Sequence, residues 1–223
     1  TLRAGDQYVA VQEDGTLCLS DKADLFVKED WGDGRINLRC ERTGKYVTTI
    51  SKGRCQSEEE DGALVAVKDA AFDWFVTAIF HIIPAENGAV RLTNRFDQPI
   101  QISKDKKLYS ALTGEGSSFL METVVDGFEE VQRLMQCAKT VILALGCHPM
   151  VNAKEEIDRT TLALPPHQEK LAKMICKIKP DAICVLFSNY PYTIHSVQNT
   201  LPAIVWSATG SQDMGTAMAQ TLY

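Results

Sequence analysis

Three short apolar runs in the later part of the chain place the strongest limit on its fold. They are Val141–Leu145, Ala182–Phe187 and Pro202–Trp206, and segments with the helical spacing of apolar residues lie around them. A short, continuous apolar run flanked by helices is typical of a strand that is buried on both faces of a parallel sheet. The order of strands and helices therefore predicts an α/β layer with a parallel sheet.

The helices of this layer are predicted from apolar residues that lie three and four positions apart. They are Gly127–Ala138, a helix opened by Pro165 and Pro166, and a helix that begins near Ser211. Three strands with two or three helices are too few to cover both faces of a sheet. We therefore expect further strands of the sheet to lie outside this chain. The residues expected to face inward are Phe128, Val131, Leu134, Met135, Leu171, Met174, Ile175, Ile178, Met214, Ala217 and Met218.

Residues 1 to about 125 have a different pattern, made of short strands and glycine turns. Tyr8–Val11 and Thr16–Leu19 predict a hairpin, because Asp14-Gly15 supplies the turn between them. The pattern then recurs along the chain. The matching positions are Tyr8 and Tyr46, Phe26 and Phe80, and Ile36–Leu38 and Val90–Leu92, with a looser third copy in Gln98–Ile102, Leu108 and Phe119–Met121.

Three weak repeats of four short strands predict a β-trefoil. The arrangement resembles the fascin-like and ricin-like trefoil superfamily. The Gln-x-Trp motif of sugar-binding ricin-type trefoils is absent, which weakens a lectin role. Trp74, in an insertion within the second repeat, is a candidate for stacking on a sugar ring, whereas a place in the core or against a neighbouring domain is the alternative. The predicted fold class is thus all-β (β-trefoil) over residues 1–125, followed by a partial α/β sandwich over residues 126–223.

Charge and composition exclude several classes of partner. The formal net charge is -6, whereas nucleic acids and anionic membranes need a basic surface. No apolar segment reaches the roughly 18 residues of a membrane span. The chain lacks a starting methionine and a signal core, so we expect it to begin inside a longer protein or after processing. Seven cysteines without a C-x-x-C pair indicate free, mostly buried thiols in a reducing, cytoplasmic setting, with no metal and no cofactor.

The loop after the first apolar run is the best place in the sequence to look for chemistry. In parallel sheets the ligand crevice lies outside the carboxyl ends of the strands. The loop from Cys147 to Gln168 is at such an end and is dense in charged side chains. Asn189, Tyr190 and Tyr192 follow the next strand and are weaker candidates for the same crevice. The candidate residues that the loop holds are His148, Lys154, Glu155, Glu156, Asp158 and Arg159.

Four features in the same order make residues 138–223 resemble the α/β-sandwich domain of glycoside hydrolase family 3, the β-glucosidase and β-xylosidase family. A strand ends at Gly146 and precedes Glu155-x-x-Asp158-Arg159. A second strand ends at Ser188, before Pro191. The other two features are Leu162–Pro165 followed by Gln168, and Leu201–Trp206 followed by Gly210-Ser-Gln212, Gly215, Ala217 and Ala219.

The resemblance implies roles for several residues. It makes Glu155 the acid/base of the reaction, with Glu156 as second choice, and Asp158 and Arg159 an ion pair that braces the loop. His148 would contact the sugar or orient Glu155, although an ordinary loop histidine is equally consistent with the sequence. Two departures are Cys147, where many members have an acidic residue, and Ala153-Lys154 before Glu155.

Some family members carry a trefoil-like insert just before this point, and the resemblance makes residues 1–125 that insert. The family's aspartate nucleophile lies in a (β/α)-barrel that this chain lacks. We therefore expect a fragment of a retaining β-glycosidase that hydrolyses terminal β-D-glucosyl or β-D-xylosyl residues and is inactive alone. Its partners would be the barrel and an oligosaccharide or an aryl or alkyl β-glycoside.

The alternative is a non-catalytic trefoil that binds carbohydrate or protein, with the α/β half as a support. A nucleotide-binding α/β protein is poorly supported, because no Gly-x-Gly-x-x-Gly or Walker-type loop is present.

Overall fold

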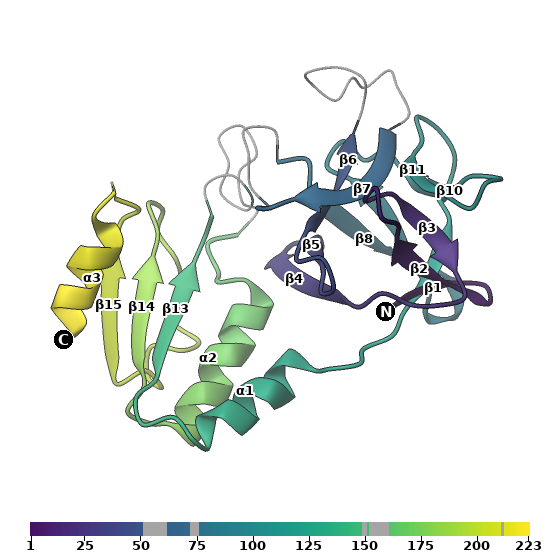
Figure 1. The fold of residues 1–223 in the computed structure, drawn as a ribbon. Coiled ribbons are helices and arrows are strands. Elements are labelled where there is room, and N and C mark those ends of the chain that lie inside the picture. Colours follow the sequence, from purple (N-terminus) through teal and green to yellow (C-terminus); the bar gives the residue numbers. More distant parts are fainter. Residues whose placement is uncertain (51–61, 72–75, 149–150, 152–160, 211) are drawn as a thin grey trace. The chain divides into compact units, whose positions relative to one another are not determined.

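The computed structural model describes residues 1–50, 62–71, 76–148, 151, 161–210 and 212–223 (Figure 1). The chain divides into two compact units, Thr1–Val124 and Val125–Tyr223. The described part of unit 1 consists of strands and one short 3-10 helix, whereas that of unit 2 alternates strands and helices. The change of pattern read from the sequence near residue 125 therefore coincides with the division between the units.

The described residues of unit 1 form a 12-stranded antiparallel sheet. In chain order the strands fall into three sets of four, and the second and third strands of each set pair as a hairpin. The first set is β1 (Leu2–Ala4), β2 (Gln7–Val11), β3 (Leu17–Ser20) and β4 (Phe26–Gly32). The second is β5 (Arg35–Cys40), β6 (Tyr46–Ile50), β7 (Gly62–Lys68) and β8 (Phe80–Pro84), and the third is β9 (Val90–Asn94), β10 (Ile100–Ile102), β11 (Leu108–Ser110) and β12 (Ser118–Met121).

The turn between β2 and β3 requires glycine, as the sequence predicts. Gly15 has φ +88°, and a Cβ at this position would lie 2.6 Å from Cγ1 of Val67 on β7. The neighbouring carboxylate of Asp14 accepts a hydrogen bond from the Thr16 amide at 2.9 Å. Bridges from Thr16 to Val65 and from Cys18 to Lys107 then join this hairpin to the other two. The three hairpins thus contact one another although they lie far apart in sequence.

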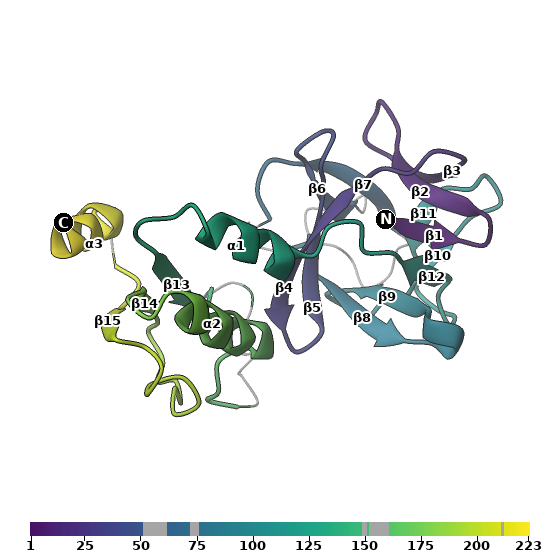
Figure 2. The ribbon, with the colours of Figure 1, turned by 90° about the horizontal axis from the view of Figure 1, so that it is seen from below.

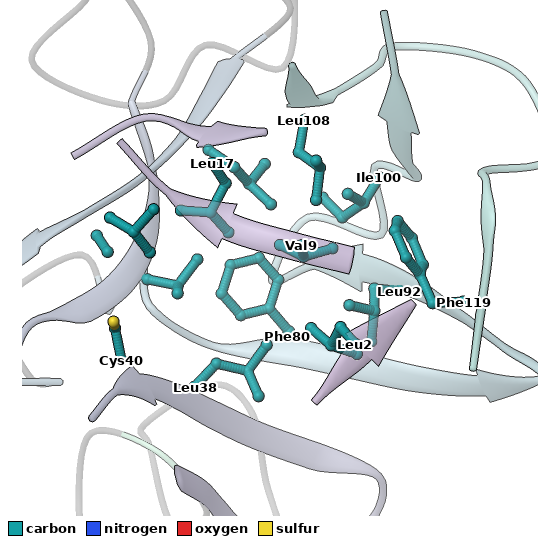
Figure 3. Packing of buried hydrophobic residues seen from close by; sticks show 14 of the residues in the cluster. Leu2, Val9, Leu17, Leu38, Cys40, Phe80, Leu92, Ile100, Leu108 and Phe119 are labelled. Carbon is teal, nitrogen blue, oxygen red and sulfur yellow. The ribbon is translucent and has the colours of Figure 1, made fainter. Parts of the chain in front are cut away.

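All three sets of strands contribute to one hydrophobic core (Figure 3). Phe80 and Phe119 are fully buried, and each lies in the last strand region of its set. Each short strand forms few hydrogen bonds, so the burial of these apolar side chains contributes most of the free energy that stabilises the sheet. The other fully buried large side chains of the core are Leu17, Ile36, Leu92, Ile100, Leu108, Val9 and Val47.

One buried carboxylate ties three segments of unit 1 together. Asp24 is 9% exposed, and its two oxygens accept hydrogen bonds from Nε and Nη2 of Arg42, both at 2.8 Å. The same carboxylate accepts from the Val11 amide at 2.8 Å, and Arg42 Nη2 also donates to the Val11 carbonyl. These bonds favour the ionised form, so Arg42 first and then the Val11 amide lower the pKa of Asp24 below its usual value.

Unit 2 contains a three-stranded parallel sheet in the order β13 (Ile142–Gly146), β14 (Ile183–Phe187) and β15 (Ala203–Ser207). The three arrows point the same way in Figure 1. The helices are α1 (Gly127–Met135), α2 (Pro166–Ile178) and α3 (Met214–Leu222). Figure 2, a view along the strands, places α1 and α2 on one side of this sheet and α3 on the other. The predicted α/β alternation and parallel pairing are confirmed.

The inward faces of α1 and α2 agree with the prediction in part, since Met135 and Ile175 are buried and Val131, Leu171 and Met174 pack against the core. On α2 the buried residues are Ala172, Ile175 and Cys176, while Ile178 is 39% exposed. On α1 only Met135 is buried, and Leu134 is 51% exposed.

Helix α3 contains no buried residue, contrary to the prediction for Met214, Ala217 and Met218. Its neighbouring strand β15 is an edge strand among the described residues, and Trp206 on it is 62% exposed. A helix beside an edge strand has fewer side chains to pack against than one over the centre of a sheet, so its apolar face remains accessible.

Six cysteines lie among the described residues and all are free; Cys55 lies outside them. Cys18, Cys40, Cys176 and Cys184 are buried, as expected, whereas Cys137 is exposed and Cys147 is half-buried. Burial raises the pKa of the Cys184 thiol to about 11.

The Asp24–Arg42 pair generates a first prediction. Asp24→Asn should lower the free energy of unfolding at neutral pH by about 1–2 kcal/mol, since Arg42 is itself partly hydrated. A carboxyl group with a lowered folded-state pKa stabilises the fold above its unfolded pKa of about 3.9, and this contribution is lost as pH falls through the folded value. The gap between parent and variant in urea unfolding should therefore shrink in acid. Asp33→Asn, which alters an exposed aspartate beside Arg35, is the matched control, and it should lower the free energy of unfolding much less than Asp24→Asn does.

Thiol reactivity gives a second prediction. At about pH 8 the exposed Cys137 should react with a maleimide in the native protein, because its free thiol is accessible to the reagent. Cys184 should react only after unfolding in urea, since both its raised pKa and its burial suppress the thiolate. Peptide mapping by mass spectrometry gives the order of labelling, and Cys184 labelling as fast as Cys137 would contradict the burial described here.

Candidate functional site

The candidate site begins where β13 ends, at Gly146. This residue pairs with Phe187 at the end of β14 and has φ +143°, a conformation in which side chains are strained. A Cβ here would lie 1.9 Å from the Phe187 carbonyl oxygen, well inside any tolerable contact. Only glycine fits, and the chain leaves the sheet at a fixed point. The loop predicted to carry the chemistry starts at the next residue.

Gln168, in the first turn of α2, holds the backbone of Gly146 through both of its polar groups. Its Nε2 donates to the Gly146 carbonyl at 2.9 Å, and its Oε1 accepts from the Gly146 amide at 3.0 Å. Pro165 precedes this turn, and its carbonyl accepts from the Gln168 amide at 2.9 Å. Residues at the two ends of the loop, 146 and 168, are thus joined by a pair of hydrogen bonds.

Two further contacts fix the loop near its ends. The Cys147 amide donates to the Phe187 carbonyl at 3.4 Å, which continues the pairing with β14 for one residue. Near the far end, the Thr193 amide donates to the Leu162 carbonyl at 2.7 Å, and Ala163 forms a parallel bridge with Thr193. Leu164, which follows, is buried in the core of unit 2.

His148 and Cys147 are the predicted loop residues whose surroundings the structure describes. His148 is partly buried, and burial lowers its pKa, which favours the neutral imidazole at neutral pH. Cys147 Sγ lies 3.8 Å from Oγ of the fully buried Ser188 at the end of β14. Cys147, the first loop residue, therefore lies against the carboxyl end of the central strand.

The ends of β14 and β15 are joined by a second side-chain contact. Asn189 Oδ1 accepts from the Thr209 amide at 2.8 Å, and Asn189 Nδ2 donates to the Thr209 hydroxyl. Tyr190, which follows, is 43% exposed. Asn189 thus joins the ends of two strands, and its amide group is used in this contact.

Of the other candidates, Tyr192 is partly buried and packs against the core of unit 2. Trp74, Glu155, Glu156, Asp158 and Arg159 lie outside the described residues, so their roles stay predictions. Within the described ranges, no three side chains of histidine, cysteine, aspartate or glutamate gather as a metal site would require. The helices that the structure describes include none with the length and apolarity of a membrane span.

Sequence reasoning included Gln168 in a family pattern but missed its role. Its two hydrogen bonds join positions 22 residues apart, and no periodicity or turn rule indicates such a contact. The available signals were indirect: a glycine that ends an apolar run, and an amide side chain just inside a helix that begins with proline.

Comparison with known proteins decides the family. Residues 13–223 match the model of the glycosyl hydrolase family 3 C-terminal domain. The chain belongs to this family. The family predicted from residues 138–223 is confirmed, and the match to the family 3 C-terminal domain extends through most of unit 1 as well.

Solved structures give weaker likenesses to this family 3 domain. A β-glucosidase from Kluyveromyces marxianus in complex with glucose is 20% identical, with a TM-score of 0.41 over 52% of this chain and 15% of the other. A selenomethionine-labelled form of that enzyme is 17% identical, with a TM-score of 0.41 over 65% of this chain and 23% of the other. The designed threefold-symmetric protein ThreeFoil is 12% identical, with a TM-score of 0.34 over 50% of this chain and 74% of the other. No curated protein matches the chain. The chain spans less than a quarter of the length of the β-glucosidase structures.

Gly146→Ala tests the start of the loop. The added methyl group meets the Phe187 carbonyl, so the strand end must move and the free energy of unfolding of unit 2 should fall by about 2–4 kcal/mol. Gly215→Ala in α3 is the control, because a Cβ there meets nothing within 4 Å. It should be neutral or stabilising by up to about 1 kcal/mol. Thermal unfolding of both variants provides the measurement, and equal melting temperatures would contradict the close contact.

Proposed function

We propose that this chain is part of a retaining β-glycosidase that removes terminal β-D-glucosyl or β-D-xylosyl residues. The observation that carries the proposal is the family match over residues 13–223, which includes the whole loop from Gly146 to Gln168. In this proposal Glu155 is the acid/base, and the nucleophile is an aspartate of a barrel domain outside the chain. The substrates are oligosaccharides or aryl and alkyl β-glycosides, and no cofactor takes part.

The reaction explains why a carboxyl group is needed on this loop. A retaining glycosidase uses two carboxyl groups about 5–5.5 Å apart, and one of them protonates the leaving oxygen while the other attacks the sugar. The first group then removes a proton from water, which hydrolyses the glycosyl-enzyme bond. We assign both proton transfers to Glu155. Glu156 remains the second choice, because adjacent carboxylates raise each other's pKa.

We further propose that residues 1–125 form a β-trefoil inserted into an α/β sandwich, of which residues 126–223 are a part. Three sets of four strands, with a central hairpin in each and contacts among the three hairpins, support the trefoil. On the sandwich side, Ile204 and Trp206 are exposed on the edge strand β15. Exposed apolar residues on an edge strand support the presence of further sandwich elements in the parent protein.

Glu155→Gln in the full-length parent tests the catalytic assignment. Because the same carboxyl group acts in both steps, turnover of 4-nitrophenyl β-glucoside should fall by about 10²–10⁴-fold. Glu156→Gln is the matched control and should retain turnover within about tenfold, the loss of a neighbouring charge shifting only the pH profile. Near-normal turnover by Glu155→Gln would remove this residue from the acid/base role, and a large loss in Glu156→Gln alone would transfer the role to its neighbour.

A further inference from the structure

We infer that Asn87 is a site of spontaneous deamidation, at which the carboxamide nitrogen is lost as ammonia and aspartate and isoaspartate are formed. Asn87-Gly88 lies in the turn between β8 and β9, and it is the one Asn-Gly pair in the sequence. The modification concerns unit 1 and does not depend on the proposed glycosidase function.

The reaction needs only these two residues and water. The backbone nitrogen of Gly88 attacks Cγ of Asn87, the new N–Cγ bond closes a five-membered succinimide ring, and the bond from Cγ to Nδ2 breaks. The amide proton passes through solvent to the departing nitrogen, which leaves as ammonia. Water then opens the ring at one of its two carbonyl carbons. Attack at Cγ gives aspartate, and attack at the backbone carbonyl carbon gives isoaspartate, in which the chain continues through the side chain.

The side chain of Asn87 is available for this reaction. It is exposed, and its carboxamide forms no hydrogen bond with any residue that the structure describes. Asn37 and Asn94 are fully buried and hydrogen-bonded through their carboxamides. The carboxamide of Asn189 is used in the contact beyond the end of β15. Among the described asparagines, only Asn87 and Asn199 therefore present this group to solvent.

The residue that follows the asparagine separates these two exposed positions. Gly88 has no side chain, and no atom lies within 4 Å of the place a Cβ would take, so the turn has room to move. Thr200 follows Asn199 and carries a branched side chain beside its amide. This amide donates to the Val197 carbonyl at 2.9 Å, and the Thr200 hydroxyl donates to the same carbonyl at 2.7 Å. The nucleophile is thus accessible after Asn87 and held after Asn199.

The backbone of the turn favours opening. Asn87 has φ +55° and ψ +33°, a left-handed conformation that few residues other than glycine adopt, and Gly88 follows with φ +75°. Ring closure requires Asn87 to rotate about ψ until the Gly88 nitrogen faces Cγ, and glycine makes this rotation easier. The Ala85 amide donates to the Ala89 carbonyl at 2.8 Å, and the Ala89 amide donates to Glu86 at 3.1 Å. Because these bonds close the turn, we expect the folded protein to react more slowly than the unfolded chain.

The two products affect the fold differently. Aspartate is compatible with the left-handed conformation and adds a negative charge. Isoaspartate adds a methylene group to the backbone of the turn, and the turn sets the register in which Pro84 pairs with Val90. The two strands of this hairpin supply the buried Phe80 and Leu92 to the core of unit 1. Conversion to isoaspartate should therefore weaken unit 1 as the protein ages.

The experiment incubates the full-length protein without denaturant at neutral and at mildly alkaline pH, and follows each asparagine by peptide mapping with mass spectrometry. The Asn87 peptide should gain about 1 Da and separate into two chromatographic species, the aspartate and isoaspartate forms. The rate should rise in proportion to the hydroxide concentration, because the attack requires loss of the Gly88 amide proton. The Asn199 peptide in the same digest is the internal control and should keep its mass.

Two variants test the chemistry of the turn. Gly88→Ala should lower the rate at Asn87 by about tenfold or more, because the methyl group obstructs the approach of the amide nitrogen. An alanine is strained at φ +75°, so Asn87→Gln provides a second variant that keeps the glycine. Ring closure from the longer side chain would need a six-membered ring, and position 87 should not convert. After the same incubation, the melting temperature of unit 1 should fall in the parent and stay unchanged in Asn87→Gln.

An unchanged mass at Asn87 after an incubation that converts the urea-unfolded chain would overturn the inference, because the folded turn would then be closed to the reaction. Conversion of Asn199 as fast as that of Asn87 would overturn it as well, since the following residue would then have no influence. A rate at Asn87 that Gly88→Ala leaves unchanged would exclude attack by the Gly88 nitrogen.

Discussion

The backbone of Gly146 is held between the Phe187 carbonyl on one side and the Gln168 carboxamide on the other. This double contact joins the three kinds of element in unit 2. It sets the last pair of the β13–β14 register, fixes where the first turn of α2 lies, and defines the point at which the loop leaves the sheet. A parallel sheet places its crevice at the carboxyl ends of its strands. Control of one strand end is therefore control of the geometry in which a loop residue can act.

Unit 1 is organised by a different constraint. Its strands are short, so no set of four can bury an adequate core alone, and stability depends on the shared cluster around Phe80, Phe119 and Leu17. Asp24 and Arg42 add a polar connection that hydrophobic burial cannot provide, because their geometry is specific to one arrangement of the Val11 backbone. The pair fixes the relative positions of the three segments more than it stabilises the fold, because the Arg42 guanidinium is still largely exposed to water, which weakens its attraction to Asp24.

The sequence predicted local structure better than contacts. The apolar runs at 141–145 and 182–187 identified β13 and β14, and Asp14-Gly15 identified its hairpin, because these features depend on neighbours in the chain. The face of α2 was predicted in part: Ile175 is buried and Leu171 and Met174 pack against the core, whereas Ile178 is exposed. The contact of Gln168 with Gly146 required two segments to meet across a loop, which no local pattern encodes. Glu155 was proposed from resemblance, and its geometry stays a prediction.

The closed base of the Gly146–Gln168 loop has a consequence for how sequences of this kind can diverge. Once the ends of a loop are held, the entropy of closing it grows only with the logarithm of its length, about 0.6 kcal/mol for each doubling. Added length between the two anchors is thus thermodynamically inexpensive, while a change at either anchor or at the buried Leu164 is not. A longer or shorter loop could therefore be carried by the same sheet and helix without a change in how either is held.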